Sequence, residues 1–376
     1  MPLDPIWAEK KKLSLNNMKK IFAIILSVAM VFSVSACEAA DENTSSAVSV
    51  LETVVTETES EISSVVSEPE IQNFDIKLTF LGDMILAKQK DISPSGRFDE
   101  YAEKNPPEYF LSKVKDILAA DDFTIANLEN VLSDRELTPR EKNYSPAFWF
   151  KSKTSNVNVL TAGSVEAVLL TNNHIMDYGE EGFNDTINTL TNAGLKYGTN
   201  DNTIYLEKNG FKIAVICAGL WAEYNVSNIV NRIKDAEQNS NFQVVFFHGG
   251  TEKLHAPETY KVNAAHTFVD NGADLVVGGH PHVLQPREIY NGVEIVYSVG
   301  NFCYGGALRP ENRTVIYQYT LNVNPETLST ETHSSEIIPC YVYTGSINNY
   351  QPAPITDETH KQKVLEFMDG KTDSPI

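Results

Sequence analysis

The stretch ADLVVGGHPH, residues 273–282, joins a short apolar run to two histidines that are one residue apart. The run predicts a buried β-strand, because it is short, apolar and rich in Val. Open α/β sheets bind their ligands in the crevice beyond the carboxyl ends of the strands. We therefore expect His280 and His282 to contribute to a site at the edge of a sheet.

Four more apolar runs end in a polar motif. They predict strands at 76–81, 122–128, 165–170 and 242–247. The candidate ligands at their ends are Asp83, Glu129, Asn173, His174 and His248. Oxygen and imidazole ligands without cysteine suit Zn, Mn or Fe. Each motif alone is more typical of a turn or of a structural histidine, but five at one sheet edge favour a single site.

The remaining pattern indicates an α/β domain. Apolar spacing predicts helices at 109–119, 180–193, 257–271 and 359–368, the third with Pro257 in its first turn. Asn209-Gly210 and Asn291-Gly292 predict two hairpins, and further strands are expected at 312–323 and 336–343. Early βαβ units followed by antiparallel hairpins favour two sheets or one mixed sheet.

Residues 18–37 resemble a bacterial lipoprotein signal. Lys19 and Lys20 precede an apolar stretch at 21–34 that is short for a membrane-spanning helix, and small residues lead directly to Cys37. We expect Met18 to be the true start and Cys37 to be lipidated. The protein would then be extracytoplasmic and anchored to the bacterial cytoplasmic membrane. An uncleaved anchor helix is the alternative.

Residues 38–73 are rich in Ser, Thr and Glu and contain nine acidic residues but no Lys or Arg. Such a segment cannot bury enough apolar surface to offset its ordering entropy, so we expect a disordered acidic tether. Residues 1–37 carry a net charge of +3, which leaves −14 of the total −20 on residues 74–376. This acidity argues against nucleic acid as a partner and repels a polyanion unless a local basic patch or bound cations offset it.

The rest of the chain, about 300 residues, is long enough for one large core or two small ones. We expect the main domain at 74–345 and a C-terminal extension with a closing helix at 346–376. Besides Cys37 the chain has Cys217, Cys303 and Cys340. An odd number without regular spacing is no disulfide framework, although one disulfide among them stays open.

The order of these motifs resembles the CapA family of capsule and poly-γ-glutamate synthesis proteins. The similarity is specific at NNHIMDYGEEG (172–182), GHPHVLQP (279–286) and YSVGNF (297–302), and it runs from about Ile76 to Gly305. The resemblance implies a variant of the calcineurin-like metallophosphoesterase fold, which is a four-layer α-β-β-α sandwich with mixed sheets. It also implies a surface lipoprotein that makes, exports or anchors poly-γ-glutamate, together with a membrane-bound polymer synthase complex.

The same resemblance assigns roles to the residues at the strand ends. One or two divalent transition-metal ions (Mn, Zn or Fe) would be bound by Asp83, Glu129, Asn173, His248, His280 and His282. His280 would share one ion with Asn173 and His248, and His282 the other with Asp83, with Glu129 as the bridge. His174 would act as the general acid.

Two positions depart from the phosphoesterase pattern. Ile85 stands where a histidine is expected two residues after the first aspartate, and the bridging residue is Glu129 instead of an aspartate. Both departures leave the number of metal ions and the phosphoesterase activity open. Asp177 and Glu252 lie near the ligands in sequence and would support them or contact substrate; capping and solvation are the alternative roles.

Two other functions stay open on the same residues. One is an extracytoplasmic metal-dependent hydrolase of phosphoesters or amides with no capsule role. The other is a non-catalytic assembly factor that keeps the fold and only part of the site.

Overall fold

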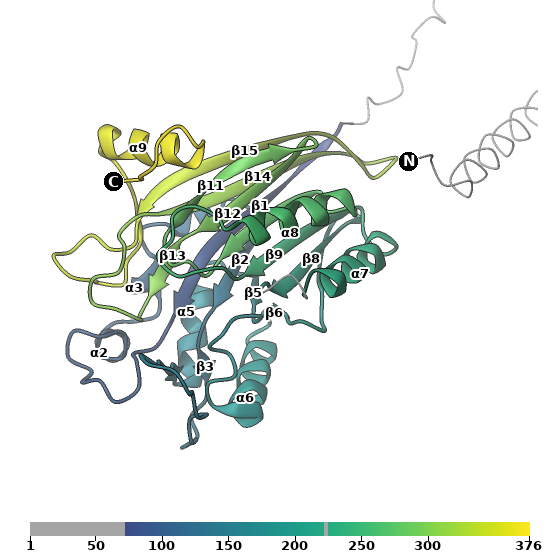
Figure 1. Cartoon of the computed structure of the whole chain (residues 1–376). Coiled ribbons are helices and arrows are strands. Elements are labelled where there is room, and N and C mark those ends of the chain that lie inside the picture. The colour runs from purple at the N-terminus through teal and green to yellow at the C-terminus, as the bar shows by residue number, and fades with distance from the viewer. Residues whose placement is uncertain (1–71, 222–224) are drawn as a thin grey trace, which may run out of the picture. The chain divides into compact units, whose positions relative to one another are not determined.

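The computed structural model describes residues 72–221 and 225–376, which belong to one compact unit (Figure 1). The predicted lipoprotein signal, Cys37 and the tether up to residue 71 lie outside the described residues. Within the described ranges, no helix has the length and apolarity needed to cross a membrane. Cys217, Cys303 and Cys340 are all buried free thiols, so the disulfide that the sequence left open does not form among them.

In the described residues the first sheet has eight strands, in the order β16-β15-β14-β1-β2-β5-β6 with β13 beside β1. β1, β2, β5 and β6 run parallel, and β14, β15 and β16 extend the sheet with antiparallel pairing. The strands are β1 (Phe74–Ile85), β2 (Phe123–Leu128), β5 (Ala167–Leu169), β6 (Lys196–Gly198), β13 (Asn301–Tyr304), β14 (Thr314–Asn324), β15 (Ser329–Tyr341) and β16 (Ala353–Pro354).

The second sheet has six strands in the described part of the chain, in the order β11-β12-β10-β9-β8-β7. Both predicted Asn-Gly hairpins are confirmed, because β7 pairs with β8 and β11 with β12 in antiparallel register, while β8, β9, β10 and β12 are parallel. The strands are β7 (Ile204–Lys208), β8 (Phe211–Gly219), β9 (Phe242–His248), β10 (Leu275–Gly279), β11 (Leu284–Tyr290) and β12 (Val293–Val299). A small separate sheet pairs β3 (Val131–Leu132) with β4 (Lys151–Ser152).

The two sheets face each other across a central apolar core. Phe80 of β1 packs edge to face on Phe246 of β9, with ring centroids 5.6 Å apart, and lies 6.2 Å from the ring of Tyr317 of β14. Neighbouring residues of a strand point to opposite faces, so Phe246 enters this central core while Phe247 packs on the outer side of its sheet. The period of two along the strands therefore places two sheets in the middle of the unit.

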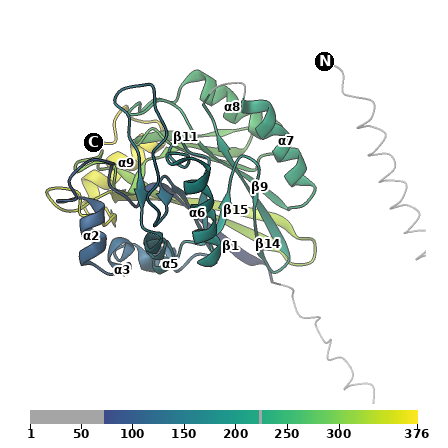
Figure 2. The same cartoon turned by 90° about the horizontal axis from the view of Figure 1, so that it is seen from below.

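Helices cover the outer face of each sheet (Figures 1 and 2). Helices α2 to α6 pack on the first sheet, and α7 and α8 pack on the second. Together with the two sheets this confirms the predicted four-layer α-β-β-α sandwich with mixed sheets. The helices are α2 (Phe98–Lys104), α3 (Glu108–Leu111), α4 (Lys115–Leu118), α5 (Val157–Ala162) preceded by the 3-10 helix η1 (Thr154–Asn156), α6 (Gly179–Asn192), α7 (Val226–Glu237), α8 (Thr259–Asp270) and α9 (Glu358–Met368).

Two of the predicted helices differ from the structure. The helix expected at 109–119 is two short helices, α3 and α4, which are separated by three residues. Helix α8 begins at Thr259 with Glu258 as its N-cap, so Pro257 precedes the helix instead of lying in its first turn. Helices α2, α5 and α7 were not expected from the sequence.

The last helix, α9, packs against β11 and β15. Its residues Val364, Phe367 and Met368 enter the central core between the sheets. The C-terminal segment therefore contributes apolar burial to the main unit.

Candidate metal centre and adjoining pocket

The strand ends of both sheets meet at one edge of the sandwich. Parallel pairing sets Asp83 of β1 beside Asn127 of β2, and Gly279 at the end of β10 beside His248 at the end of β9. The side chains of Asp83 and Glu129 are fully buried, and that of His248 is 1 % exposed. The sequence predicted this edge as the site because carboxyl ends of parallel strands share one side of a sheet.

The described residues contain two groups of potential metal ligands, and within each group the ligand atoms all lie within 4.8 Å of one another. Glu129 belongs to both groups. The first group joins it to Asp83 and His248, and the second joins it to His280 and His282. His248 Nε2 and His282 Nε2 lie 3.5 Å and 3.9 Å from Glu129 Oε1. Glu129 therefore lies at the centre of the cluster.

His248 also contacts the other expected ligands. Its Nδ1 lies 3.4 Å from Asp83 Oδ1, and its Nε2 lies 3.1 Å from both Asn173 Oδ1 and His280 Nδ1. His282 Nδ1 lies 3.1 Å from Asp83 Oδ2. All six residues that the sequence assigned to metal binding thus share one network of contacts.

The carboxylate of Glu129 tests whether the cluster fits a metal ion. Both of its oxygens are buried, and neither has a hydrogen-bond partner among the described residues. A buried carboxylate without hydrogen bonds costs several kcal/mol unless a cation compensates it. Imidazole, carboxylate and amide oxygen together suit a divalent transition metal, so the residues present fit such an ion.

Without a bound metal ion, the ionisable side chains of the cluster shift one another's pKa values. Burial raises the pKa of Asp83, but the charges and hydrogen bonds of His248 and His282 outweigh it and hold that pKa well below its usual range. Burial lowers the pKa of both histidines, yet Glu129 and Asp83 raise each to about 9. Burial and the two neighbouring imidazoles lower the pKa of His280 to about 2. A cation that binds here would replace protons held by His248 and His282.

The backbone around the two histidines is held in an unusual conformation. His280 has φ 98° and His282 φ 58°, in the region where non-glycine residues cost of order 1–3 kcal/mol. The His280 N–H donates to Asp83 Oδ2 at 3.2 Å, Asn301 Nδ2 donates to the His282 carbonyl at 2.9 Å, and the Lys253 N–H donates to the Pro281 carbonyl at 2.7 Å. These bonds fix the direction of both imidazoles.

Three asparagines that were not among the predicted ligands support the cluster. Asn127 Nδ2 donates to Asp83 Oδ1 at 2.8 Å and lies 3.0 Å from His248 Nδ1, and Asn172 Nδ2 donates to Asn127 Oδ1 at 2.9 Å. Asn301 Oδ1 lies 3.0 Å from His282 Nδ1. Such partners orient ligands and tune their basicity. A signal was present, because Asn172 and Asn301 lie in the quoted stretches NNHIMDYGEEG and YSVGNF, and Asn127 comes two residues before Glu129.

His174 is oriented by Asp177. Its Nδ1 lies 2.8 Å from Asp177 Oδ2, and the same carboxylate accepts from the Phe150 N–H at 2.9 Å and pairs with Lys142 Nζ at 2.5 Å. The His174 ring packs edge to face on Phe150, with centroids 4.7 Å apart. Nδ1 is thus committed to Asp177, which leaves Nε2 for chemistry in the neighbouring pocket.

Ile85 takes the position where the phosphoesterase pattern has a histidine. Its side chain is fully buried and clusters with Ala87 and Phe150, with Phe148 and Tyr304 packed against them. The group of metal-ligand candidates therefore has an apolar wall on the side of Ile85, and position 85 supplies no ligand.

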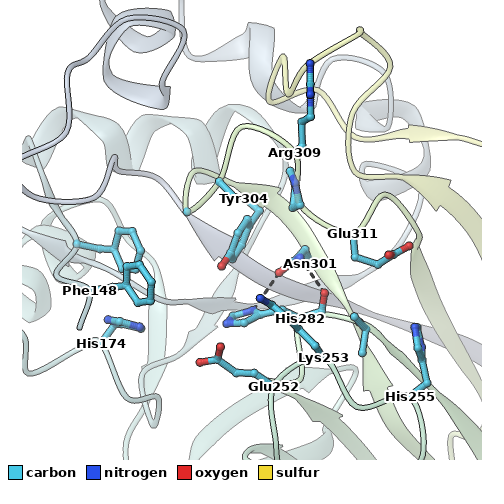
Figure 3. Close-up of a pocket in the computed structure, with 15 residues that line it drawn as sticks. Phe148, His174, Glu252, Lys253, His255, His282, Asn301, Tyr304, Arg309 and Glu311 are labelled. Atoms are coloured by element: carbon cyan, nitrogen blue, oxygen red, sulfur yellow. Dashed lines mark hydrogen bonds between the residues drawn. The ribbon is translucent and has the colours of Figure 1, made fainter. Parts of the chain in front are cut away.

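A cavity of about 460 Å³ adjoins the cluster (Figure 3). His174, His282 and Asn301 line it on the side of the cluster, and Tyr304 and the exposed Glu252 also border it. Lys253, Arg309 and Glu311 add charged groups at the rim. A substrate in this cavity would contact His174 and, among the ligand candidates, His282.

Comparison with known proteins gives the family. The model described as "Bacterial capsule synthesis protein PGA_cap" matches residues 77–305. The chain belongs to this family. The resemblance seen in the sequence motifs is thereby confirmed.

Two relatives cover most of the chain. The PGA biosynthesis protein CapA of Bacillus subtilis (strain 168) is 27% identical over 326 residues, which are 79% of this chain and 79% of the relative. The capsule biosynthesis protein CapA of Bacillus anthracis is 26% identical over 329 residues, which are 80% of this chain and 74% of the relative.

Solved structures are more distant. A hypothetical protein from Thermus thermophilus matches 70% of this chain and 99% of its own with a TM-score of 0.43 and 14% identity. A novel phosphatase from Mycoplasma pneumoniae matches 71% and 94% with a TM-score of 0.42 and 14% identity. Similarities this weak say nothing about the activity of the chain.

Proposed function

We propose that the chain performs a metal-dependent hydrolase or transferase step on an anionic capsule polymer of the poly-γ-glutamate type. The observation that carries the metal-dependent step is the buried carboxylate of Glu129, which has no hydrogen-bond partner among the described residues and lies among three imidazoles beside a cavity. Membership of the capsule synthesis family supports the polymer as substrate.

Different residues would bind the metal ions and transfer the proton. Asp83, Glu129 and the histidines would hold one or two divalent ions, which supply Lewis acidity and lower the pKa of a water molecule. His174 would give the leaving group a proton from Nε2, since Asp177 fixes the ring through Nδ1. The cavity would place the scissile bond between the metal ions and His174.

The negative charge of the domain needs to be offset if the substrate is a polyanion. Bound divalent cations would invert the local charge at the edge of the sheets. Lys253 and Arg309 line the same cavity and would attract carboxylates of the polymer. Attraction would then be confined to the site, while the rest of the surface repels the polymer.

The proposal includes a place in the cell. The motif before Cys37 supports a lipid anchor on the outer side of the cytoplasmic membrane, and the acidic segment that follows supports a tether. There the domain would work beside a membrane-bound polymer synthase complex. Membrane and polymer synthase are then its partners.

The His174→Ala variant tests the catalytic part. We expect it to keep the metal content of the wild-type protein and to lose about 10²- to 10⁴-fold in hydrolysis of poly-γ-glutamate, the usual contribution of a general acid. The loss on bis(p-nitrophenyl) phosphate should be smaller, because p-nitrophenolate leaves without a proton. Metal would be measured by mass spectrometry, and hydrolysis on poly-γ-glutamate and on bis(p-nitrophenyl) phosphate. His266→Ala is the matched control, because His266 pairs with Glu288, stacks on Tyr290 and takes no part in the network of ligands.

The two substrates separate the alternatives. Full activity of His174→Ala on poly-γ-glutamate would remove the acid role, and wild-type protein purified without a divalent metal would contradict the site. Cleavage of the phosphodiester alone would favour a hydrolase unrelated to capsule polymer. A metal-loaded wild-type protein that cleaves neither would favour an assembly factor.

A further inference from the structure

Tyr304 lies at the end of β13 and lines the cavity beside the metal ligands (Figure 3). Parallel pairing of β13 with β1 sets Tyr304 next to Ile85, the position without the expected histidine. Figure 3 shows its hydroxyl directed into the cavity, toward the space bordered by His174, Glu252 and His282. The Tyr304 hydroxyl thus faces the part of the cavity next to His174 and His282, on a side that is otherwise apolar.

The ring of Tyr304 is held firmly, while its hydroxyl has no partner in the described residues. The ring packs against the cluster of Ile85 and Phe150 and lies 5.1 Å from the ring of His282. Its backbone carbonyl accepts a bond from Asn348 Nδ2 at 2.7 Å. A phenol keeps its proton at neutral pH, so Tyr304 offers an oriented hydrogen-bond donor that no neighbour uses.

Gly306 makes room for this orientation. A Cβ at this position would lie 2.6 Å from Tyr304 Cζ and 2.7 Å from Tyr304 Oη. Contacts under 3 Å do not persist, so any larger residue at 306 would push the tyrosine from the place that it occupies. The position of the hydroxyl therefore depends on a glycine two residues along the chain.

We propose that Tyr304 is a catalytic residue whose hydroxyl donates a hydrogen bond to the scissile group as that group gains negative charge. The inference rests on the proposed function and adds a residue to it. A fixed donor aimed at a developing oxyanion costs no reorganisation during the reaction, and removal of one such donor usually lowers the rate about 10²- to 10³-fold.

The step balances for an amide of the polymer. The oxygen of a water molecule forms a bond to the carbonyl carbon, and the C=O electron pair moves to the carbonyl oxygen, which accepts the bond from Tyr304 Oη. The electron pair on this oxygen then re-forms the C=O bond, and the C–N bond breaks as the nitrogen takes a proton from His174 Nε2. The water gives up one proton to solvent and a proton returns to His174, so that the products are a carboxylic acid and an amine.

The Tyr304→Phe variant removes only the hydroxyl. On the better of poly-γ-glutamate and bis(p-nitrophenyl) phosphate we expect kcat to fall about 10²-fold, with metal content and thermal midpoint unchanged. Tyr109→Phe is the matched control, because its hydroxyl bonds the Asn349 carbonyl in the helical layer and its loss should leave kcat unchanged. A Tyr304→Phe enzyme with wild-type kcat would overturn the inference.

Binding of inorganic phosphate tests the role of the Tyr304 hydroxyl without requiring catalysis. Inorganic phosphate carries negatively charged tetrahedral oxygens, and calorimetry on the Mn²⁺-loaded protein should show about tenfold weaker binding to Tyr304→Phe than to wild type or Tyr109→Phe. Equal binding, or none to wild type, contradicts the role of Tyr304. Wild-type protein that binds phosphate through Tyr304 but cleaves neither substrate would contradict the proposed function and leave the donor in place.

Gly306→Ala gives an independent route to the same hydroxyl. We expect it to reproduce the phosphate-binding loss of Tyr304→Phe, and the double variant should lose no more than either single variant, because residues that act as a unit are not additive. Additive losses would show that Gly306 acts through something other than Tyr304.

Discussion

Glu129 is a buried carboxylate whose charge is balanced either by the protonated imidazoles of His248 and His282 or by a bound metal ion. Its oxygens are buried and unpartnered among the described residues, and the four groups that surround it come from the ends of three different strands. We expect Glu129→Gln to lower metal affinity about 10-fold or more, since an amide lacks the charge that a bridging ligand provides. Metal content after dialysis measures this, with Glu311→Gln at the cavity rim as the control. Wild-type retention in Glu129→Gln would remove it from the site.

Glu166 gives a prediction that is independent of the metal centre. Burial raises its pKa from 4.5 to about 7, the nearby charge of Asp121 adds to the rise, and the Thr124 N–H bonds its Oε2 at 2.7 Å. A raised carboxyl pKa means that the folded state loses stability as pH rises through the interval from about 4.5 to 7.

Glu166→Gln removes that ionisation and keeps an oxygen for the Thr124 N–H. We expect the variant to be more stable than wild type by about 1–2 kcal/mol at pH 8, after allowance for solvent screening, and to approach wild type near pH 4.5. Urea unfolding at several pH values measures the difference. Glu207→Gln, an exposed change on β7, should show no such pH-dependent gain; a pH-independent gain at Glu166 would contradict the argument.

At the scale of elements, β1 is longer than its sequence suggested. The alternating pattern predicted residues 76–81, whereas the strand continues to Ile85 because β13 pairs with its end, at Asp83 with Asn301 and at Ile85 with Tyr304. That partner lies more than 200 residues away in the chain, so no local pattern indicates it. The added residues include the first metal ligand candidate.

The close approach of β1 to the backbone of Gly300 depends on Gly82. A Cβ there would lie 1.9 Å from the Gly300 carbonyl oxygen, a backbone atom that also accepts from the Asp83 N–H at 3.0 Å. We expect Gly82→Ala to destabilise the fold by about 2–3 kcal/mol and to reduce metal content, because the backbone that carries Asp83 must move. Thermal unfolding and metal analysis measure both effects.

Gly194→Ala is the control for this prediction. Gly194 has a positive φ of 76°, but a Cβ there meets nothing within 4 Å. The change should cost only about 1–2 kcal/mol of backbone strain and leave metal content unchanged. Equal metal loss in both variants would show that general destabilisation, not displacement of Asp83, releases the ion.

At the scale of the whole molecule, the proposed anchor decides where the domain works. Cys37→Ala should move the protein from the membrane fraction to the soluble fraction, because lipidation of Cys37 would be the link to the bilayer. Fractionation with an immunoblot measures this, and Cys303→Ala, a buried thiol of the domain, is the control. Unchanged membrane partition of Cys37→Ala would favour an uncleaved anchor helix.

The sequence by itself determined the α/β class, the hairpins and the edge at which polar residues gather. These follow from local periodicity and from the rule that parallel strands end on one side, and they were enough to select His248, His280 and His282 as neighbours. Only the tertiary structure decided which atoms meet. Strand register brings Asn127 to Asp83, the left-handed backbone at His280 and His282 aims the imidazoles at Glu129, and β13 carries Asn301 and Tyr304 to the cluster. Contacts between segments so far apart depend on how the two sheets pack, and no stretch of sequence contains that information.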